Sequence, residues 1–334
     1  MNEKRRNCGE VPGLTEGRGC GAEAIMSLAP AFRSSGDLLA DRRYDCAAAA
    51  LADGDAIAAA DLFEQAAEIA PRWAAAWFGL GEARERLGEN EAAADAFRRA
   101  AACDAQDELG AALRLARLSG ASPAAPPAGY VRGLFDQYAG RFDEHLRRDL
   151  AYRGPELLLE AIAGARAARG GCAHFGRVLD LGCGTGLMAR ALAPHFESIH
   201  GVDLSPRMVE MARASGFYDH AEAGDLQTFL EAQDAGSADL IVAADVFVYL
   251  GDLAPVFRAA ARALGADGLF AFTVQRGAGA DYALGADLRY FHDEAYLRRL
   301  ARENGLAVAE LREASTRKDA GVDVPGLVAV FCAP

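Results

Sequence analysis

Residues 178–186 read Val-Leu-Asp-Leu-Gly-Cys-Gly-Thr-Gly. An apolar run that contains Asp180 leads into a glycine-rich turn, and a helical pattern begins near Leu187. Glycine is needed where a ligand touches the backbone, because a Cβ atom would block its approach. The glycines of the turn are Gly182, Gly184 and Gly186. The stretch therefore predicts a strand, a ligand-binding turn and a helix, in that order.

From this turn onward, strand-like apolar runs alternate with amphipathic helical stretches. The runs cover residues 177–181, 198–202, 238–243 and 268–274. Such alternation is typical of an α/β fold with a parallel sheet and helices on both of its faces. Near the end of the chain, residues 306–312 and 327–331 are two further strand-like runs joined by polar residues, which indicates an antiparallel hairpin.

The acidic residues around the turn indicate which nucleotide it binds. Asp203 ends the next strand, where a carboxylate can accept both hydroxyls of a ribose. A dinucleotide turn has the pattern G-x-G-x-x-G, but Leu187 stands at the sixth position, and Asp180 would repel a pyrophosphate. Both departures disfavour NAD. They suit S-adenosylmethionine, whose ammonium group would lie near Asp180, directly or through water.

Residues 178–186 resemble motif I of the class I S-adenosylmethionine-dependent methyltransferases, and residues 239–250 resemble motif IV of that family. The resemblance implies a Rossmann-like, seven-stranded sheet with the order 3-2-1-4-5-7-6 and an antiparallel last strand. It also implies that Asp203 holds the ribose, Leu204 lies against the adenine and Asp225 faces the adenine amino group. The cofactor would be converted to S-adenosylhomocysteine when it gives up its methyl group.

The cofactor site implied by the resemblance extends beyond these residues. Cys183 is expected to be passive, because its position in the turn requires only a small side chain. Asp245 has two open interpretations, as a helix N-cap ahead of Val246 or as a residue that faces the acceptor. No metal site is expected. The implied cofactor-binding residues are Asp180, Gly182, Cys183, Gly184, Gly186, Asp203, Leu204, Met208, Asp225, Leu226, Ala244 and Asp245.

Upstream of the sheet, a set of residues recurs with a spacing of 34. Gly54, Ala59, Phe63 and Ala66 recur as Gly88, Ala93, Phe97 and Ala100. This period is that of the tetratricopeptide repeat (TPR), a helix pair that must stack on its neighbours to bury its apolar face. Residues 36–118 are predicted to hold two such units and a capping helix. The array is either a peptide-binding groove for a protein partner or a structural or dimerising spacer.

An aromatic segment, residues 130–143, lies between the repeats and the sheet. Together with the repeats, it resembles the bacterial TPR-containing predicted methyltransferases, in which a Tyr- and Phe-rich helix precedes the catalytic core. The resemblance implies a lid over the cofactor, with Tyr130, Tyr138 and Phe142 as its aromatic candidates. The alternative is that Phe135 and Phe142 are core residues of an amphipathic helix.

Residues 119–129 contain three prolines among Ala, Gly and Ser and are predicted to form a semi-rigid linker. The domain boundary is placed there, with the methyltransferase domain at residues 130–334. Because such a linker would separate two cores, deletion of residues 1–118 is expected to leave cofactor binding intact. Residues 1–35 lack periodicity and are predicted to be a disordered tail, or an overlong start with Met26 as the alternative first residue.

The candidates for the acceptor side lie mainly in residues 289–293, which read Arg-Tyr-Phe-His-Asp. Arg289 is a candidate to hold a carboxylate or phosphate, and His292 is a candidate catalytic base that would titrate near neutrality. Tyr249 is a third catalytic candidate. The alternative for His292 is that it caps the following helix together with Asp293. A general base is needed only if the nucleophile must lose a proton.

Composition limits the partners of the 334-residue chain. A net charge of −13 disfavours nucleic acid and anionic membrane surfaces. Apolar stretches are too short to span a membrane and the first ten residues are polar, so a cytoplasmic protein is expected. The seven cysteines include no C-x-x-C pair, which disfavours a disulfide framework or zinc. The acceptor is expected to be a small molecule or a protein, and the competing hypothesis is a scaffold that binds the cofactor without turnover.

Overall fold

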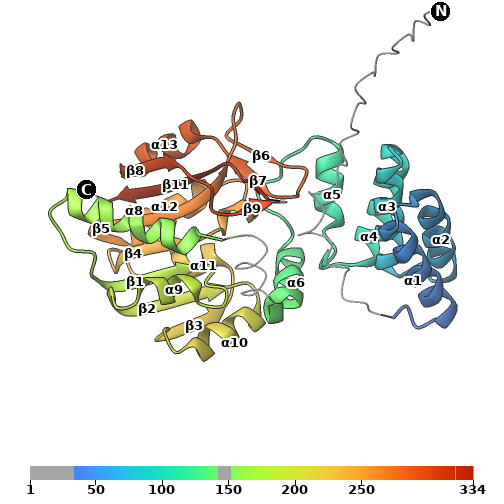
Figure 1. Ribbon diagram of the computed structural model, residues 1–334, viewed down its shortest axis with the longest axis horizontal. Helices are drawn as coiled ribbons and strands as arrows, with labels where there is room; N and C mark the ends of the chain where they lie inside the picture. Colours follow the sequence, from blue (N-terminus) through green and yellow to red (C-terminus); the bar gives the residue numbers. More distant parts are fainter. Residues whose placement is uncertain (1–33, 142–151, 320, 334) are drawn as a thin grey trace, which may run out of the picture.

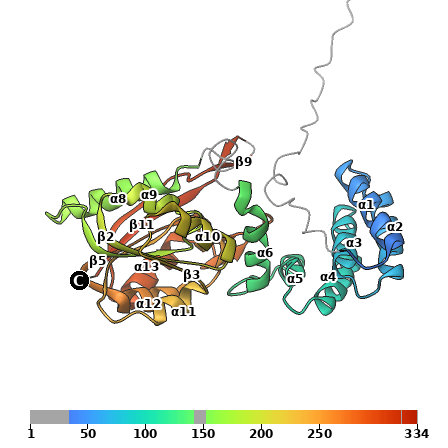
Figure 2. The ribbon, with the colours of Figure 1, turned by 90° about the horizontal axis from the view of Figure 1, so that it is seen from below.

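The computed structural model describes residues 34–141, 152–319 and 321–333. Most of the predicted tail therefore lies outside the described residues. Figures 1 and 2 both show a group of N-terminal helices beside a sheet covered by further helices, with α5 (Ala111–Leu118) and α6 (Ala128–Tyr138) between the two parts. None of the described helices is long and apolar enough to cross a membrane.

The N-terminal helices form antiparallel pairs. They are α1 (Leu38–Ala52), α2 (Ala56–Ile69), α3 (Ala74–Arg86) and α4 (Asn90–Cys103). Glycines of α3 let the helices approach closely, because a Cβ added to Gly79 would lie 2.5 Å from the ring of Phe63, and one added to Gly81 would lie 2.6 Å from Phe97. The two phenylalanines that recur in the sequence thus fill equivalent positions. The assignment to the tetratricopeptide class stays a prediction.

The segment between the repeats and the sheet is packed against the sheet domain. The backbone N–H groups of Gly251 and Asp252 both donate to the carbonyl of Ala124 at 2.9 Å, and the N–H of Leu284 donates to Ser122 Oγ at 3.0 Å. The expectation that a linker separates two cores therefore does not match the structure. A proline-rich composition indicates stiffness, but it does not show what the stiff segment contacts.

One apolar cluster continues from α5 into the sheet domain. Leu113 of α5 is 1% exposed and packs with Tyr130 and Val131 of α6 and with Leu288 and Tyr290. Removing α5 would expose this cluster, so α5 contributes to the stability of the sheet domain as well as to that of the N-terminal helices.

The sheet has the predicted order of its seven main strands, β3-β2-β1-β4-β5-β11-β8, with β11 antiparallel to both of its neighbours. The predicted C-terminal hairpin is thus confirmed as β8 and β11. The strands of this path are β1 (Phe175–Leu181), β2 (Phe196–Asp203), β3 (His220–Ala223), β4 (Ala238–Ala243), β5 (Leu264–Arg276), β8 (Ala307–Glu313) and β11 (Gly326–Cys332).

Two apolar cores cover the two faces of the sheet. Successive residues of β1 alternate between them, because side chains point to opposite faces along a strand: Val178 packs with α8 and α9, and Leu179 packs with the core that holds α12 and α13. Figure 2 shows α8 and α9 on one side of the sheet and α11, α12 and α13 on the other. The helices are α8 (Gly154–Ala168), α9 (Leu187–Leu192), α10 (Pro206–Ser215), α11 (Leu226–Glu231), α12 (Ala254–Ala263) and α13 (Glu294–Glu303).

Short strands that the sequence analysis did not identify extend the sheet. β6 (Tyr282–Leu284) and β7 (Tyr290–His292) form a hairpin, and β7 pairs in parallel with the end of β5. A separate ribbon consists of β9 (Lys318–Asp319) and β10 (Val322–Asp323). Strands of two or three residues are too short to produce a readable alternation of polar and apolar residues.

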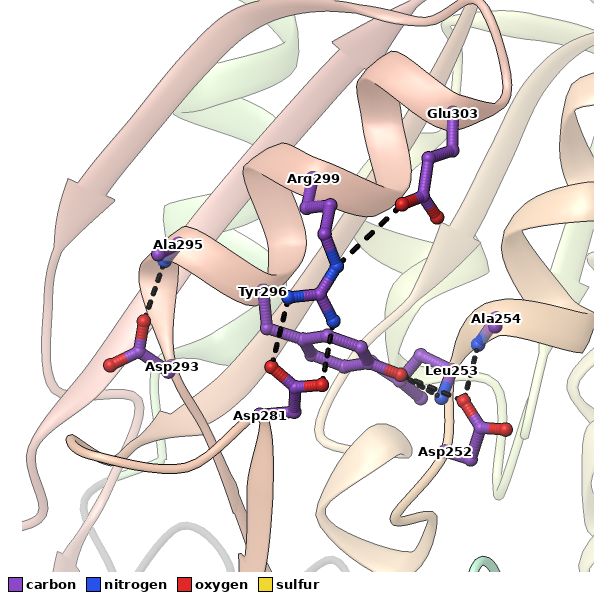
Figure 3. A network of polar contacts seen from close by, with 9 residues as sticks. All are labelled: Asp252, Leu253, Ala254, Asp281, Asp293, Ala295, Tyr296, Arg299 and Glu303. Atoms are coloured by element: carbon purple, nitrogen blue, oxygen red, sulfur yellow. Dashed lines mark hydrogen bonds and ion pairs between the residues drawn. The ribbon is translucent and has the colours of Figure 1, made fainter.

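Polar contacts fix the β6–β7 hairpin to α13 (Figure 3). Both guanidinium NH groups of Arg299 donate to the carboxylate of Asp281, at 3.0 and 2.6 Å, just before β6. On the next turn of the helix, the hydroxyl of Tyr296 donates to Asp252 at 2.8 Å and accepts from the N–H of Leu253 at 2.8 Å. These bonds hold the hairpin, α13 and the loop after β4 in fixed positions relative to one another.

Candidate active site

The glycine turn after β1 has the backbone conformation that its composition predicts. Gly182, Gly184 and Gly186 have φ values of +64°, +52° and +91°, a region that favours glycine over every other residue. A Cβ on Gly182 would also lie 2.5 Å from Val246. Gly186 is the N-cap of α9, which begins at Leu187 as predicted.

Asp203 connects this turn to the end of β2. Its Oδ2 accepts a hydrogen bond from the N–H of Gly184 at 2.9 Å, and its Oδ1 accepts one from the N–H of Ser205 at 2.9 Å. Burial raises the pKa of Asp203, against the opposing effect of the two N–H groups. A carboxylate with bonds on both oxygens is held in one orientation beside the turn.

Asp180 is a buried carboxyl group at the end of β1. It is 1% exposed, and its Oδ2 accepts a hydrogen bond from the hydroxyl of Tyr218 at 2.6 Å. Burial raises the pKa of Asp180 to about 7, although the Tyr218 bond acts in the opposite direction. No basic side chain among the described residues forms an ion pair with it. The group is therefore suited to gain a cationic ligand.

A cavity of about 210 Å³ lies at the carboxyl ends of β1, β2, β3 and β4. This is where open α/β sheets bind their ligands. The structure places many of the predicted residues in its wall. They are Asp180, Gly182, Cys183, Gly184, Asp203, Leu204, Asp225, Leu226, Ala244, Asp245, Tyr138, Tyr249 and Arg289.

Other predicted residues do not line the cavity. Tyr130 is 7% exposed and packs in the cluster with Leu113, so its role as a lid aromatic is not supported. Met208 is fully buried in α10, where its N–H donates to Ser205 Oγ, and Gly186 is the N-cap of α9. Phe142 lies outside the described residues.

The prediction of His292 as a catalytic base was wrong. Its side chain is fully buried outside the cavity wall, and its Nε2 lies 3.0 Å from the carbonyl oxygen of Gly251. Burial lowers the pKa of His292 to about 4, so the ring is neutral at physiological pH. The capping role belongs to Asp293 alone, whose carboxylate accepts from the N–H of Ala295. The sequence placed both residues correctly before α13 but could not show the burial.

Helix α6 contributes several residues to the cavity wall, of which Tyr138 is a predicted lid aromatic. Val131, Leu134, Phe135 and Tyr138 of this helix line the cavity. The ring of Phe135 meets that of Tyr249 edge to face, with 5.3 Å between their centroids. Phe135 is thus a wall residue as well as a partly buried one.

A hydrogen bond ties α6 to the loop that carries Asp203. The hydroxyl of Ser205 donates to Asp136 of α6 at 2.5 Å, and the same hydroxyl oxygen caps α10. Asp203 accepts from the N–H of Ser205, so both α6 and the Asp203 carboxylate are hydrogen-bonded to Ser205.

Asp245, after β4, is not a helix N-cap. It has a φ of +60°, and its carboxylate accepts from Thr316 Oγ1 and from Arg317, both at 3.1 Å. Arg317 is 3% exposed and Asp245 is partly exposed, so the ion pair lies largely buried at the cavity wall. The sequence analysis missed Thr316, Arg317 and the wall residue Tyr152, because no local pattern connects them with the glycine turn.

Arg289 and Tyr249 are the predicted acceptor residues that do line the cavity. Arg289 is 8% exposed, and its guanidinium carbon lies 5.7 Å from the centroid of the Tyr249 ring. Burial opposes the charge of Arg289, but Tyr249, Asp245 and Asp287 outweigh it, and the pKa of Arg289 is raised. A permanent cation is therefore enclosed in the wall.

Within the part of the chain that the structure describes, no group of three or more His, Cys, Asp or Glu side chains is arranged to hold a metal ion. The polar groups of the cavity are instead single carboxylates on the strand ends, tyrosines and two buried arginines.

Comparison with known proteins identifies relatives of the sheet domain. A family model described as a methyltransferase domain matches residues 142–311. Human methyltransferase-like protein 27 is 36% identical over 115 residues, which is 34% of this chain and 45% of that protein. A ubiquinone biosynthesis O-methyltransferase from Thiobacillus denitrificans is 32% identical over 155 residues, which is 40% of this chain and 66% of the relative. The chain thus spans less than two thirds of either relative.

A solved structure, that of the cyclase SpnF, has the same fold. The two chains superpose with a TM-score of 0.50 at 18% identity, and the match covers 64% of this chain and 98% of SpnF. At this identity the likeness describes the fold, and chemistry must be argued from the site.

Proposed function

This chain belongs to the class I S-adenosylmethionine-dependent methyltransferases, and we propose that it transfers a methyl group to a small-molecule acceptor within the cavity at the strand ends. Membership of this family and the strand order confirm the predicted α/β fold of the sheet domain. The family also confirms S-adenosylmethionine as the predicted cofactor. The observation that carries the proposal is the meeting of the glycine turn, Asp180 and Asp203 in one cavity with Tyr249 and Arg289.

The residues present fit the cofactor. The positive-φ glycines of the turn carry no Cβ atom that would block a ligand from the backbone, and three carboxyl groups at strand ends line the same cavity. We assign Asp203 to the ribose hydroxyls, Asp225 to the adenine amino group and Asp180 to the ammonium group. When bound, S-adenosylmethionine supplies an electrophilic methyl group, and in-line transfer to an acceptor lone pair leaves the bonding electrons on sulfur as S-adenosylhomocysteine.

Enclosure of the cavity favours a small molecule over a protein as the acceptor. The helix α6 and residues Ala125 and Pro126 of the proline-rich segment contribute to its wall, and apolar side chains such as Leu134 and Leu250 exclude water from it. Alignment and desolvation can supply much of the rate of such a transfer, so the burial of His292 away from the cavity is compatible with turnover.

The alternative is a scaffold protein in which residues 36–118 are the working part. We propose that these residues form a TPR-like array joined by residues 119–129 to a methyltransferase domain at 130–334, and that the array is the surface for any protein partner. The polar acceptor end, with Arg289 and Arg317, favours turnover over cofactor binding alone, because a collapsed apolar pocket would leave the methyl group without a nucleophile.

Calorimetric titration of the purified protein with S-adenosylmethionine, S-adenosylhomocysteine and NAD tests this function. We expect the first two ligands to bind and NAD not to bind, followed by methyl transfer in a screen of small-molecule acceptors. Binding of NAD would contradict the site assignment. Cofactor binding without transfer to any small molecule or protein would favour the scaffold.

The affinity for S-adenosylhomocysteine is expected to rise with pH around neutrality. Its ammonium group is held by ionised Asp180, and the pKa of this carboxyl is raised to about 7, so cofactor binding below that pH must displace a proton. For the same reason, Asp180 contributes to the stability of the unliganded fold at low pH, and this contribution is lost as pH rises to about 7. Titrations from about pH 5.5 to about pH 8.5, on either side of that pKa, measure the dependence.

Two variants check the origin of this pH dependence. Asp180→Asn should bind the ligand more weakly, with a flatter pH profile. Tyr218→Phe removes the hydrogen bond that lowers the pKa of Asp180, so the profile should shift to higher pH. An unchanged profile in Asp180→Asn would assign the titration to another group, such as Asp203, whose pKa is also raised.

A further inference from the structure

Arg289 is a buried cation without a carboxylate partner among the described residues. It lines the cavity and is 8% exposed, and its side chain contacts the ring of Tyr249. The nearby carboxylates are engaged elsewhere. Asp245 is paired with Arg317, and Asp287 accepts from the backbone N–H of Arg289 at 3.1 Å and from Gln275 at 3.4 Å.

A guanidinium without a direct ion pair is costly to bury. Asp245, Asp287 and a hydrogen bond with Tyr249 keep Arg289 charged, but neither carboxylate forms an ion pair with it. Tyr249 offsets only part of this cost, since a cation–π contact is worth roughly 0.5–2 kcal/mol. The planar guanidinium has donors spaced to bind the two oxygens of a carboxylate or phosphate. A ligand with such a group would form with Arg289 the direct ion pair that neither Asp245 nor Asp287 forms.

The backbone that carries Arg289 is rigidly held. The N–H of Gly285 donates to the carbonyl of Arg289 at 2.7 Å, which closes the β6–β7 hairpin. The hairpin is in turn fixed to α13 by the bidentate pair of Asp281 and Arg299 (Figure 3). A charge on a fixed support is preorganised for a ligand and cannot move readily to solvent.

We propose that Arg289 binds an anionic group, a carboxylate or a phosphate, on the acceptor. The body of this acceptor lies against the apolar wall made by Leu134, Phe135 and Leu250. The substrate class is thus a small, largely apolar or aromatic acid. This inference rests on the proposed methyl transfer, because it assigns the part of the same cavity that the cofactor does not fill.

The position of Arg289 separates it from the cofactor residues. Asp180, Asp203 and Asp225 follow β1, β2 and β3, whereas Arg289 directly precedes β7 and contacts Tyr249, which follows β4. Tyr249 also meets Phe135 of the lid helix. The arginine therefore belongs to the wall formed by the lid and the β6–β7 insertion.

Ligand binding to the protein saturated with S-adenosylhomocysteine tests the inference. The probes are benzoate, phenyl phosphate and, as an uncharged match, benzamide, each titrated by calorimetry. We expect at least one of the two anions to bind about tenfold or more tightly than benzamide, as a charge-assisted hydrogen bond implies. Preference for benzoate assigns the site to carboxylates, and preference for phenyl phosphate assigns it to phosphates.

Variants then attribute this binding to the arginine. Arg289→Gln should weaken binding of the anion about tenfold or more, and Arg289→Lys should weaken it less, because it keeps the charge but loses the fork. Arg276→Gln is the matched control, since Arg276 at the end of β5 is half exposed, pairs with Glu313 and lies outside the cavity wall. Arg276→Gln should leave the affinity for the anion and the affinity for S-adenosylhomocysteine unchanged.

Three outcomes would overturn the inference. They are equal binding of benzamide and both anions, anion binding that survives in Arg289→Gln, and a loss of S-adenosylhomocysteine affinity in Arg289→Gln and Arg289→Lys alike. The last result would assign the arginine to the carboxylate of the cofactor. Absence of S-adenosylhomocysteine binding to the unaltered protein is a different result, because it contradicts the proposed function itself.

Discussion

Replacement of Asp203 by alanine is expected to weaken S-adenosylhomocysteine binding by about a hundredfold or more. The carboxylate is assigned to two ribose hydroxyls, and a hydrogen bond to a charged group contributes about 1.5–3 kcal/mol. The change also removes the acceptor for the N–H groups of Gly184 and Ser205, so the glycine turn loses its connection to β2. Calorimetric titration of the variant measures the loss.

Two further variants separate the ribose contacts from the support of the turn. Asp203→Asn keeps a carbonyl oxygen for one N–H group and should retain more affinity than Asp203→Ala. Glu222→Ala removes an exposed carboxylate from β3, outside the cavity wall, and should bind as the unaltered protein does. Unaltered affinity in Asp203→Ala would show that the nucleoside lies elsewhere.

Deletion of residues 1–118 is expected to destabilise the sheet domain, whereas deletion of residues 1–103 is not. The longer deletion removes Leu113, and loss of a fully buried leucine side chain costs about 2–5 kcal/mol. It also uncovers Tyr130 and Val131 of α6, the helix that lines the cavity. The shorter deletion keeps α5 and Asp107, whose carboxylate accepts from the N–H groups of Ala111 and Ala112 at the start of that helix.

Thermal unfolding and S-adenosylhomocysteine titration of both truncated chains measure these effects. A matched pair in the full chain isolates the contact, because Leu113 faces the sheet domain and Leu115 packs in the cluster of Phe97. Leu113→Ala should lower the stability of the domain that binds the cofactor, and Leu115→Ala should not. Equal behaviour of the two truncated chains would restore the interpretation of residues 119–129 as a spacer between independent cores.

The packing of Leu113 also places α5 close to the end of the cavity that we propose binds the acceptor. Its partner Tyr290 is the chain neighbour of Arg289, and its partner Val131 lines the cavity. The fold alone does not carry such information, since SpnF shares the fold and is a cyclase. We therefore expect acceptor specificity to depend on α6 and on the β6–β7 hairpin, which are additions to the seven-stranded sheet.

The glycine turn and the strand-end acids could be recognised from the sequence, and the family resemblance implied the order of the main strands. The features read from the sequence are local, and each can be recognised from a few consecutive residues. They are the alternation along a strand, a glycine where φ is positive and an acid at the end of an apolar run. Parallel strands then bring their carboxyl ends to one edge, so Asp180, Asp203 and Asp225 could be placed in one cavity before the structure was known.

Which of the other polar residues line that cavity could be seen only from the folded chain. Tyr218 reaches Asp180 from 38 positions away in the chain, and Arg317 reaches Asp245 from 72 positions away. His292 and Arg289 are three residues apart, yet one is buried beside Gly251 and the other lines the cavity. Burial determines the charge and the hydrogen bonds of a side chain. It depends on contacts with segments that are distant in the chain, which local sequence patterns do not reveal.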